Sequence, residues 1–336
     1  MNVIFEEATH SYHTMMKGQK IYGISVTTII EKFRIPYQTK FWSTYRSIQN
    51  YLEMEKPEMS KLCKDNGFNW YKFLEEEEKR IKYLKSCIGD KICNWEEAIK
   101  KAPYVANEWE VKKNNKGKLG TEFHEYKEEQ AHKTKVEKIN GSRVNLSSNA
   151  TMQLKAIKYS VDLTKLEDGY HSEVLVYITQ IKIGNKTYNV FITGQVDKLF
   201  IETIDGVRYI TLDDYKTNDK ITTENNFQKF RKPLNHLPDT KLIGYSLQLG
   251  LYGRILEEYG YVVKRLFFTH HDLLSLGMTN ELDKSKVNTE YTKVYELTYY
   301  KNELHEMIKY YCNEQGLKIE NNGNSSDVDY IDYICL

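Results

Sequence analysis

The stretch GQVDKLFIETIDGVRYITLDDYKT, from Gly194 to Thr217, decides the fold. It is typical of two strands joined at Asp205-Gly206, a dipeptide that favours the type I′ turn of a two-residue hairpin. Counting outward from this turn pairs Asp197 with Asp214, and directly opposed residues point to the same face of a sheet. Lys216 follows Asp214 by two residues, so it shares that face. The sequence therefore predicts two carboxylates and one ammonium at the open end of a hairpin.

This arrangement predicts a divalent metal ion, because two carboxylates so close repel each other unless a cation lies between them. Hard oxygen ligands select Mg²⁺ or Mn²⁺, and an imidazole ligand shifts the preference toward Mn²⁺. A lysine beside such a metal can stabilise hydroxide, which suits hydrolysis of a phosphodiester. The alternative is a surface ion cluster. The matched register and the flanking Val, Ile, Leu and Phe residues argue against it.

Composition limits the remaining possibilities. The 336 residues carry a net charge of +1, so any attraction to nucleic acid must come from local patches. The start of the chain has acids and no apolar run, which predicts no signal peptide, and no stretch approaches the length of a membrane span. Five cysteines without a CxxC pair favour a reducing, cytoplasmic location and argue against structural zinc.

The pattern along the chain predicts three regions: a strand and helical region over 1–115 that covers the site, a core over 116–316, and an acidic flexible tail over 317–336. A lysine- and asparagine-rich loop over 112–120 is expected to interrupt the helical pattern. The further elements predicted are a loop over 137–147, strands over 171–181, 187–194, 207–215 and 262–270, and helices over 148–165, 240–259 and 299–314. The tail could dock a protein partner, with disorder alone as the alternative.

Two further residues are candidates for the site. His124 lies four residues after Gly120 on a predicted helix, so the glycine would let another element approach beside the imidazole; a lone helical histidine is more often structural. Glu173 lies on the first predicted strand, and its direction depends on the turn at Gly184-Asn185. A two-residue turn points it away from Asp197, and a three-residue turn points it toward Asp197.

Candidate DNA contacts are of two kinds, and each has a structural alternative. Ser25 and Thr27 either touch a phosphate at a helix N-terminus or simply cap that helix, which should end before Pro36. Cations between aromatic residues can follow a phosphate backbone and stack bases, although the same residues also suit an ordinary exposed loop. The cations of this second kind are Lys229, Arg231 and Lys232, together with Lys112, Lys113, Lys116 and Lys118.

Four motifs in order, GTEFH, GQVD, DDYKT and QLGLY, resemble the PD-(D/E)XK nuclease superfamily in its RecB-like exonuclease branch. The stretches HSY…SVTTII and HLPDTKLIGYSLQLGLYGRIL are similar to phage exonucleases and to mitochondrial genome-maintenance exonucleases, and the resemblance covers residues 3–315. It implies an α/β fold with an αβββαβ core, in which a mixed central sheet is flanked by helices.

The resemblance also implies roles. Asp197, Asp214 and the Tyr215 carbonyl would bind the metal with His124, and Lys216 would be the catalytic lysine. Gln248 and Tyr252 would position DNA beside the site. Glu173 matches a recurrent acidic position whose role is less settled. Several relatives hold an iron–sulfur cluster, but only Cys312 and Cys335 follow the core here, so no cluster is expected.

The predicted function is a metal-dependent DNA exonuclease that acts on single-stranded ends in recombination, repair or end processing. One alternative is a structure- or sequence-specific endonuclease of the same fold. Another is a nucleic-acid-binding module that has lost activity, although Asp197, Asp214 and Lys216 are all present.

Overall fold

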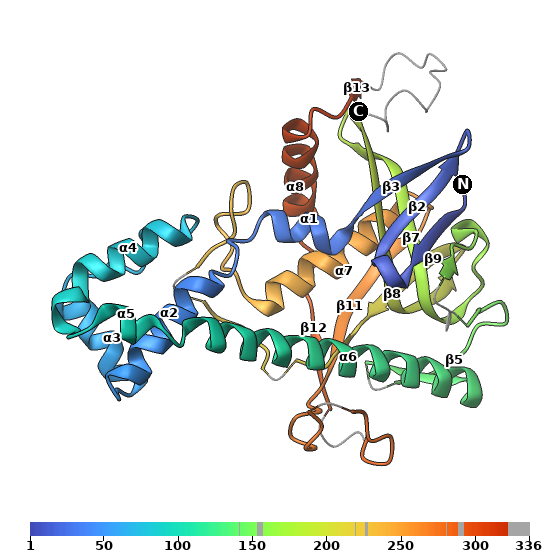
Figure 1. Cartoon of the computed structure of the whole chain (residues 1–336). Helices are drawn as coiled ribbons and strands as arrows, with labels where there is room; N and C mark the ends of the chain where they lie inside the picture. Colours follow the sequence, from blue (N-terminus) through green and yellow to red (C-terminus); the bar gives the residue numbers. More distant parts are fainter. Residues whose placement is uncertain are drawn as a thin grey trace. The chain divides into compact units, whose positions relative to one another are not determined.

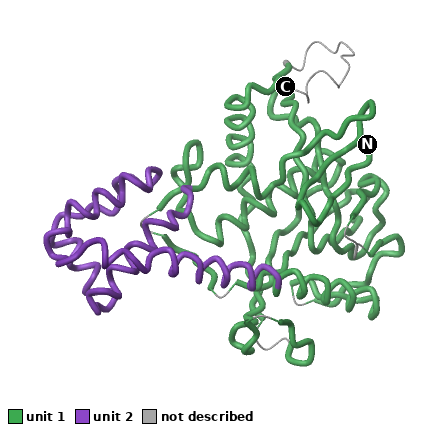
Figure 2. The backbone as a smooth tube through the Cα atoms, viewed as in Figure 1, with its two compact units in different colours: residues 1–34, 119–336 green, residues 35–118 purple. Residues whose placement is uncertain are grey.

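The chain divides into two compact units (Figure 2). Residues 1–34 and 119–336 form unit 1, and residues 35–118 form unit 2. The first boundary therefore differs from the predicted one, because the N-terminal strands pair into the main sheet instead of joining the helices that follow. The computed structural model describes residues 1–140, 142–152, 157–218, 220–225, 228–279, 281–287 and 292–321. Most of the predicted tail lies outside these residues.

Unit 2 is helical and has an aromatic core. Its helices, besides the start of α6, are α2 (Thr39–Tyr51), α3 (Lys56–Asp65), α4 (Glu77–Ile88) and α5 (Trp95–Ile99). The Trp42 and Trp70 rings stack with centroids 6.1 Å apart, and the buried Arg80 guanidinium lies 4.1 Å above the ring of Phe41. These contacts pack the helices of unit 2 together.

Helix α6 (Ala102–Thr134) is continuous, and the predicted loop over 112–120 is wrong (Figure 1). Lysine and asparagine are tolerated on solvent-facing turns of a helix, and an internal glycine costs only about 1 kcal/mol relative to alanine. The buried residues Leu119 and Phe123 pack the later part of α6 into unit 1. This packing offsets the weak local propensity.

Unit 1 contains a mixed sheet, so the predicted α/β class with a mixed central sheet is correct. In the described part of the chain its path is β10-β11-β9-β8-β3-β2-β1-β6, with β7 and β13 paired to β8 and β12 paired to β11. The strands of the path are β1 (Val3–Glu6), β2 (Ser11–Met16), β3 (Gln19–Ser25), β6 (Ile157–Tyr159), β8 (Lys186–Ile204), β9 (Val207–Asp213), β10 (Tyr215–Lys216) and β11 (Val262–His271). The others are β7 (Gly169–Ile183), β12 (Thr292–Glu296) and β13 (Ile319–Asn321).

The centre of the sheet is an antiparallel meander. Strand β7 pairs with β8, and β8 pairs with β9. Helix α7 (Lys241–Glu257) then connects β9 to β11, which runs parallel to β9. Along the chain, α6 precedes this meander with further strands between them, and β10 follows β9 before α7 begins. Thr240 caps α7 by accepting a hydrogen bond from the Ile243 amide at 3.1 Å.

The predicted β8–β9 register is confirmed. Pairing runs without a break from Ile204–Val207 to Lys198–Asp213. Asp205 and Gly206 have φ angles of 51° and 76°, as a type I′ turn requires. The ladder ends one pair before Asp197 and Asp214, so these two carboxylates lie where the two strands begin to separate.

The β7–β8 ribbon contains a bulge that corrects the prediction for Glu173. Its turn has two residues, because Ile183 pairs with Lys186, and a regular ribbon would then point Glu173 away from Asp197. Farther along, however, Ile178 pairs with Ile192 and Gln180 with Asn189. Two residues of β8, Val190 and Phe191, therefore lie opposite a single residue of β7, Thr179. The extra residue shifts the register by one and places Glu173 opposite Asp197.

The N-terminal strands β1, β2 and β3 form a meander, and Lys17-Gly18 is the turn between β2 and β3, since Met16 pairs with Gln19. Strand β6 pairs with β1. The predicted helix over 148–165 is wrong for the described residues, because this part of the chain contains β6 and the short helix Leu163–Lys165. Strand formation here is a tertiary effect, since β6 pairs with a strand more than 150 residues earlier.

The remaining elements complete unit 1. Helix α1 (Val26–Lys32) is capped by Ser25, whose Oγ accepts a hydrogen bond from the Thr28 amide at 3.0 Å, as predicted. In place of the predicted loop over 137–147, β4 (Val136–Ile139) and β5 (Ser142–Asn145) pair as a small ribbon. Helix α8 (Lys301–Glu314) packs its buried Leu304 and Met307 into the main core.

A buried ion pair lies on the β8–β9 ribbon next to the two site carboxylates. Lys198 Nζ donates to Asp213 Oδ2 at 2.6 Å, and the side chains are 1% and 0% exposed. The Thr269 hydroxyl on β11 donates to Asp213 at 3.0 Å. Lys198 and Asp213 directly oppose each other and point to the face away from Asp197. The network therefore joins β8, β9 and β11 behind the site.

We expect Lys198→Met to lower the free energy of unfolding by about 3–5 kcal/mol, because it leaves Asp213 buried without its cation. Lys198→Met combined with Asp213→Leu should recover most of this loss, since a buried ion pair can be replaced by apolar side chains at little cost. Urea denaturation followed by circular dichroism measures both. Lys264→Met is the control, because the ion pair of Lys264 with Glu202 is largely exposed; its effect should stay below about 1 kcal/mol. A double variant no more stable than Lys198→Met would contradict this account.

Candidate metal centre

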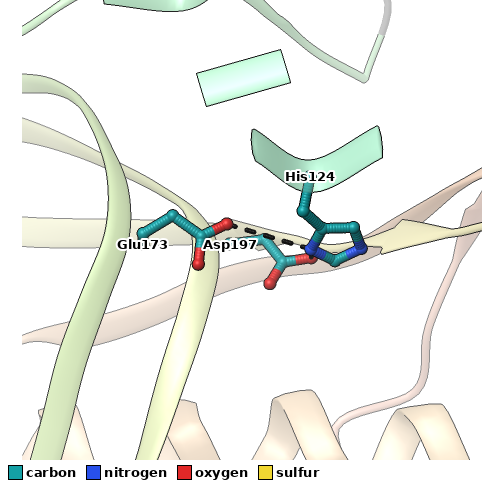
Figure 3. Close-up of side chains that lie close together, drawn as sticks. All are labelled: His124, Glu173 and Asp197. Atoms are coloured by element: carbon teal, nitrogen blue, oxygen red, sulfur yellow. Dashed lines mark ion pairs between the residues drawn. The ribbon is translucent and has the colours of Figure 1, made fainter. Parts of the chain in front are cut away.

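His124, Glu173 and Asp197 converge from three separate elements (Figure 3). His124 lies on α6, Glu173 on β7 and Asp197 on β8. The imidazole Nδ1 is 3.3 Å from Asp197 Oδ2 and 3.8 Å from Glu173 Oε1. One ligand atom from each residue can be chosen so that all lie within 4.8 Å of one another. A group of two carboxylates and one imidazole at this spacing could hold one metal ion.

Close packing of α6 against β10 brings His124 to the carboxylates. A Cβ atom on Gly120 would lie 3.2 Å from the Thr217 hydroxyl, so the absence of a side chain permits the approach that the sequence predicted. The Tyr215 amide donates to Asp197 Oδ2 at 2.9 Å and fixes this carboxylate. The Tyr215 ring packs on Phe123 at a centroid distance of 5.7 Å. The Tyr215 carbonyl as a metal ligand stays a prediction.

Glu173 has an unusual backbone. Its φ of 52° is in the left-handed region, which a non-glycine residue in a strand rarely adopts. Gln195 on β8 donates from Nε2 to Glu173 Oε2, which leaves Oε1 on the side of His124. Strained residues persist where the surrounding structure determines them and are frequent at functional sites. Glu173 is thus a full member of the cluster, whereas the sequence left its role open.

Asp214 and Lys216 form an ion pair next to this group. Lys216 Nζ contacts Asp214 Oδ2, and both side chains are largely buried. The ammonium lies 4.7 Å above the ring of Tyr245 on α7. The group that meets the 4.8 Å spacing contains Glu173 and lacks Asp214. Asp214 as a direct metal ligand therefore stays a prediction, and its observed contact is with the lysine.

The electrostatics show an excess of negative charge. Burial raises the pKa of Glu173, and the neighbouring Asp197 raises it further, to about 8. Burial and Asp197 also hold the pKa of Asp214 well above its usual range. Burial opposes the imidazolium of His124, yet Asp197 and Glu173 outweigh this effect and raise its pKa to about 9. Glu173, Asp214 and His124 are thus stabilised in the protonation state that lowers the negative charge. Asp197 is the exception: burial opposes its ionised form, but His124 and Lys216 outweigh this effect and hold its pKa well below its usual range.

The residues present fit a hard divalent cation. The group offers carboxylate oxygens and an imidazole nitrogen, and its carboxylates are buried at a spacing where they repel each other. A cation held by His124, Glu173 and Asp197 would remove this repulsion. Mg²⁺ and Mn²⁺ match these ligand types.

Helix α7 lines the site with the two residues predicted to position DNA. Gln248 Nε2 donates to the Tyr252 hydroxyl at 3.2 Å. The Tyr252 ring is buried and rests on Gly194, where a Cβ atom would lie 2.3 Å from Cε1 of the ring. The glycine of the GQVD motif is therefore required by this close contact. Contact of Gln248 and Tyr252 with DNA stays a prediction.

The other predicted DNA contacts lie elsewhere. The Ser25, Thr27 and Thr28 hydroxyls bond to one another at the start of α1, which accounts for them structurally. The Arg231 amide donates to the Phe33 carbonyl at 2.6 Å, which joins this loop to the end of α1. Phe230 is 2% exposed, so it cannot stack on bases, and Phe227 lies outside the described residues.

The remaining predicted cations carry no further evidence for DNA binding. The backbone of Lys229 forms an isolated antiparallel β-bridge with Pro238, and Lys232 follows in the same segment. Lys112 and Lys113 are exposed on the unit 2 part of α6. A nucleic-acid contact for each of these residues stays a prediction.

Sequence reasoning missed three residues of the site. They are Lys158 on β6, whose Nζ lies 3.8 Å from Glu173 Oε2, Tyr12 on β2 and Tyr245 on α7. The pKa of Tyr12 is raised by its burial and by the charges of Glu173 and Asp197, which lie close to it. Tyr245 could have been found from its spacing of seven residues before Tyr252. Lys158 had no local signal, because long-range pairing with β1 places it.

Comparison with known proteins gives little. No protein-family model matches the chain, and no curated protein matches it. A solved structure titled "Crystal structure of SSO0001" aligns with 44% of this chain and 50% of its own length, at 14% identity and a TM-score of 0.23. This likeness is too weak to carry an argument. Among the helices of the described residues, none has the length and apolarity to cross a membrane.

Mn²⁺ should stabilise the protein against unfolding, because only the folded chain brings the ligands together. At a concentration of about 100 times Kd, the gain is about 2.7 kcal/mol. We expect Glu173→Gln and Asp197→Asn to reduce this gain sharply, as measured by thermal unfolding with and without Mn²⁺. Glu202→Gln, an exchange on the same strand outside the cluster, should retain it. An equal gain in all four proteins would place metal binding elsewhere.

Proposed function

We propose that the chain is a divalent-metal-dependent deoxyribonuclease that hydrolyses phosphodiester bonds as an exonuclease, from single-stranded ends. One observation carries the proposal: His124, Glu173 and Asp197 form a group of metal-ligand type with two buried carboxylates, directly beside the Asp214–Lys216 ion pair. A structural ion cluster needs no group with the spacing of metal ligands, whereas metal-dependent phosphodiester hydrolysis uses an acidic metal site, and a nearby cation stabilises the negative charge that develops.

Each residue has a distinct part in this proposal. His124, Glu173 and Asp197 would hold the cation, with Asp214 completing the acidic set. When bound, Mg²⁺ or Mn²⁺ supplies a Lewis acid that polarises a phosphate oxygen. Lys216, held between Asp214 and the ring of Tyr245, places a fixed positive charge where negative charge develops during phosphodiester cleavage. Gln248 and the Tyr252 hydroxyl would orient the strand at the wall formed by α7.

The resemblance to RecB-like PD-(D/E)XK nucleases supports the same proposal. The motifs GTEFH, GQVD and DDYKT supply residues that lie close together in the fold, although His124 precedes Asp197 by 73 positions and Asp197 precedes Tyr215 by 18. The elements α6, β7, β8, β9, α7 and β11 follow one another in the order that the resemblance implies, with β4, β5 and β6 inserted after α6 and β10 inserted after β9. A role in DNA recombination, repair or end processing follows from the proposed activity.

The deciding experiment uses single- and double-stranded DNA labelled at either end, with Mg²⁺, Mn²⁺ or EDTA. We expect metal-dependent release of nucleotides from single-stranded ends and none in EDTA. Closed circular single- and double-stranded DNA should remain intact, because an exonuclease requires an end. Nicking of the circles would identify an endonuclease instead. Binding without cleavage of any substrate would identify an inactive binding module.

Asp214→Asn and Lys216→Ala should each lower turnover by more than tenfold, which corresponds to about 1.4 kcal/mol in the activation barrier. The asparagine keeps the volume of the side chain but removes its charge, so the fold should persist. Single-turnover cleavage of labelled DNA gives the rates, and circular dichroism checks folding. Glu202→Gln on β8 is the control and should cleave at the normal rate. Retention of more than a tenth of normal turnover in either site variant would show that the site is misassigned.

A further inference from the structure

The N-terminal part of the sheet supplies a second ammonium group to the site. Lys158 on β6 pairs with Phe5 on β1, and Phe5 pairs with Tyr12 on β2. Directly paired residues point to one face, so these side chains form a row across three strands. The Lys158 ammonium lies 5.9 Å above the ring of Phe5, and the Phe5 and Tyr12 rings are 4.7 Å apart.

This row faces the metal-ligand group. Lys158 Nζ is 3.8 Å from Glu173 Oε2, and its side chain is only 12% exposed. Phe5 and Tyr12 belong to one apolar cluster with Leu175 of β7, two residues beyond Glu173. Lys158 therefore lies on the Glu173 side of the site, whereas Lys216 is paired with Asp214.

A site that only bound a metal ion would not be expected to hold Lys158 at this position. An ammonium group repels a divalent cation, and Glu173 already has a neutral donor, Gln195, on the same oxygen. Among the groups joined by these ion pairs, the carboxylates are Glu173, Asp197 and Asp214. A divalent cation and Lys216 together balance their charge. Lys158 adds a further positive charge beside Glu173, and a phosphodiester oxygen can accept a charge-assisted hydrogen bond from such an ammonium group.

We propose that Lys158 is a substrate-binding residue that contacts a phosphate group of the nucleic-acid strand at the metal centre. The inference rests on the proposed nuclease function and adds to it the N-terminal sheet as part of the substrate site. Lys158 has its ammonium next to Glu173 and above the ring of Phe5, and its backbone is fixed by pairing with β1. It is therefore held in place before the strand arrives.

The test measures binding, so it does not depend on turnover. The full chain is titrated in Mg²⁺ with a single-stranded oligonucleotide whose linkages are phosphorothioates, which keep the backbone charge and resist hydrolysis. Affinity is measured at several salt concentrations. The variants are Lys158→Met, Lys158→Gln and Lys158→Arg. Lys20→Met on β3 is the matched control, because Lys20 is an exposed lysine whose ion pair is with Glu6. Thermal unfolding confirms that each variant is folded.

We expect Lys158→Met and Lys158→Gln to weaken binding on the order of tenfold. The slope of log K against log salt should fall by about 0.7, the value for one phosphate contact to a single strand. Lys158→Arg and Lys20→Met should bind like the unmodified chain. Mn²⁺ affinity without DNA should be unchanged or higher in Lys158→Met, because a repulsive charge has been removed.

Two results would overturn the proposal in distinguishable ways. If the unmodified chain binds the oligonucleotide, and a folded Lys158→Met or Lys158→Gln variant binds it equally with the same salt slope, Lys158 does not contact the strand. Weaker Mn²⁺ binding in that variant would assign Lys158 to the positioning of Glu173 instead. If the unmodified chain binds no oligonucleotide, the nuclease function itself fails, and the role of Lys158 fails with it.

Discussion

The hydrogen-bonded register between β8 and β9 is the constraint on which the site depends. Every residue of this ribbon is assigned to one face or the other by its distance from the Asp205-Gly206 turn. A shift by one residue would turn Asp197 to the face that carries Asp213 and Thr269, and would turn Lys198 toward the metal-ligand group. The turn is an obligatory two-residue connection with both φ angles positive, so the shifted register has no comparable turn to support it.

The same ribbon holds two kinds of charge, one on each face. Behind the site, Lys198 and Asp213 balance each other at 2.6 Å and are almost fully buried. On the site face, Glu173, Asp197 and Asp214 lie close together, and burial and the charge of Asp197 raise the pKa values of Glu173 and Asp214. A balanced pair is complete without a further partner, whereas clustered carboxylates with raised pKa values would be stabilised by a bound metal ion. This difference distinguishes the Lys198–Asp213 pair from the residues of the candidate site, although the sequence shows aspartate and lysine at both places.

Local chemistry made part of this architecture predictable from sequence. The hairpin, its register, the cap of α1 and the order of the central elements each follow from turn residues or short-range periodicity. Features set by distant contacts were not predictable. Lysine and asparagine residues at 112–118 suggested a loop, but the helix is continuous because its later turns are packed into unit 1. Strand β6, and with it Lys158, exists only through pairing with β1.

The bulge opposite Thr179 links the site to a distant part of the ribbon. Six residues separate Thr179 from Glu173, which is about 20 Å along a strand. Loss of one residue at Val190 or Phe191 would restore a regular ladder and rotate Glu173 to the opposite face, while every residue of the metal-ligand group stayed unaltered. Insertions or deletions in this outer segment therefore either reverse the direction of Glu173 or leave it unchanged. An odd number of residues reverses it, and an even number does not. When homologous chains differ in length in this segment, the direction of the residue at the position of Glu173 follows from the number of residues in the turn and in the bulge taken together.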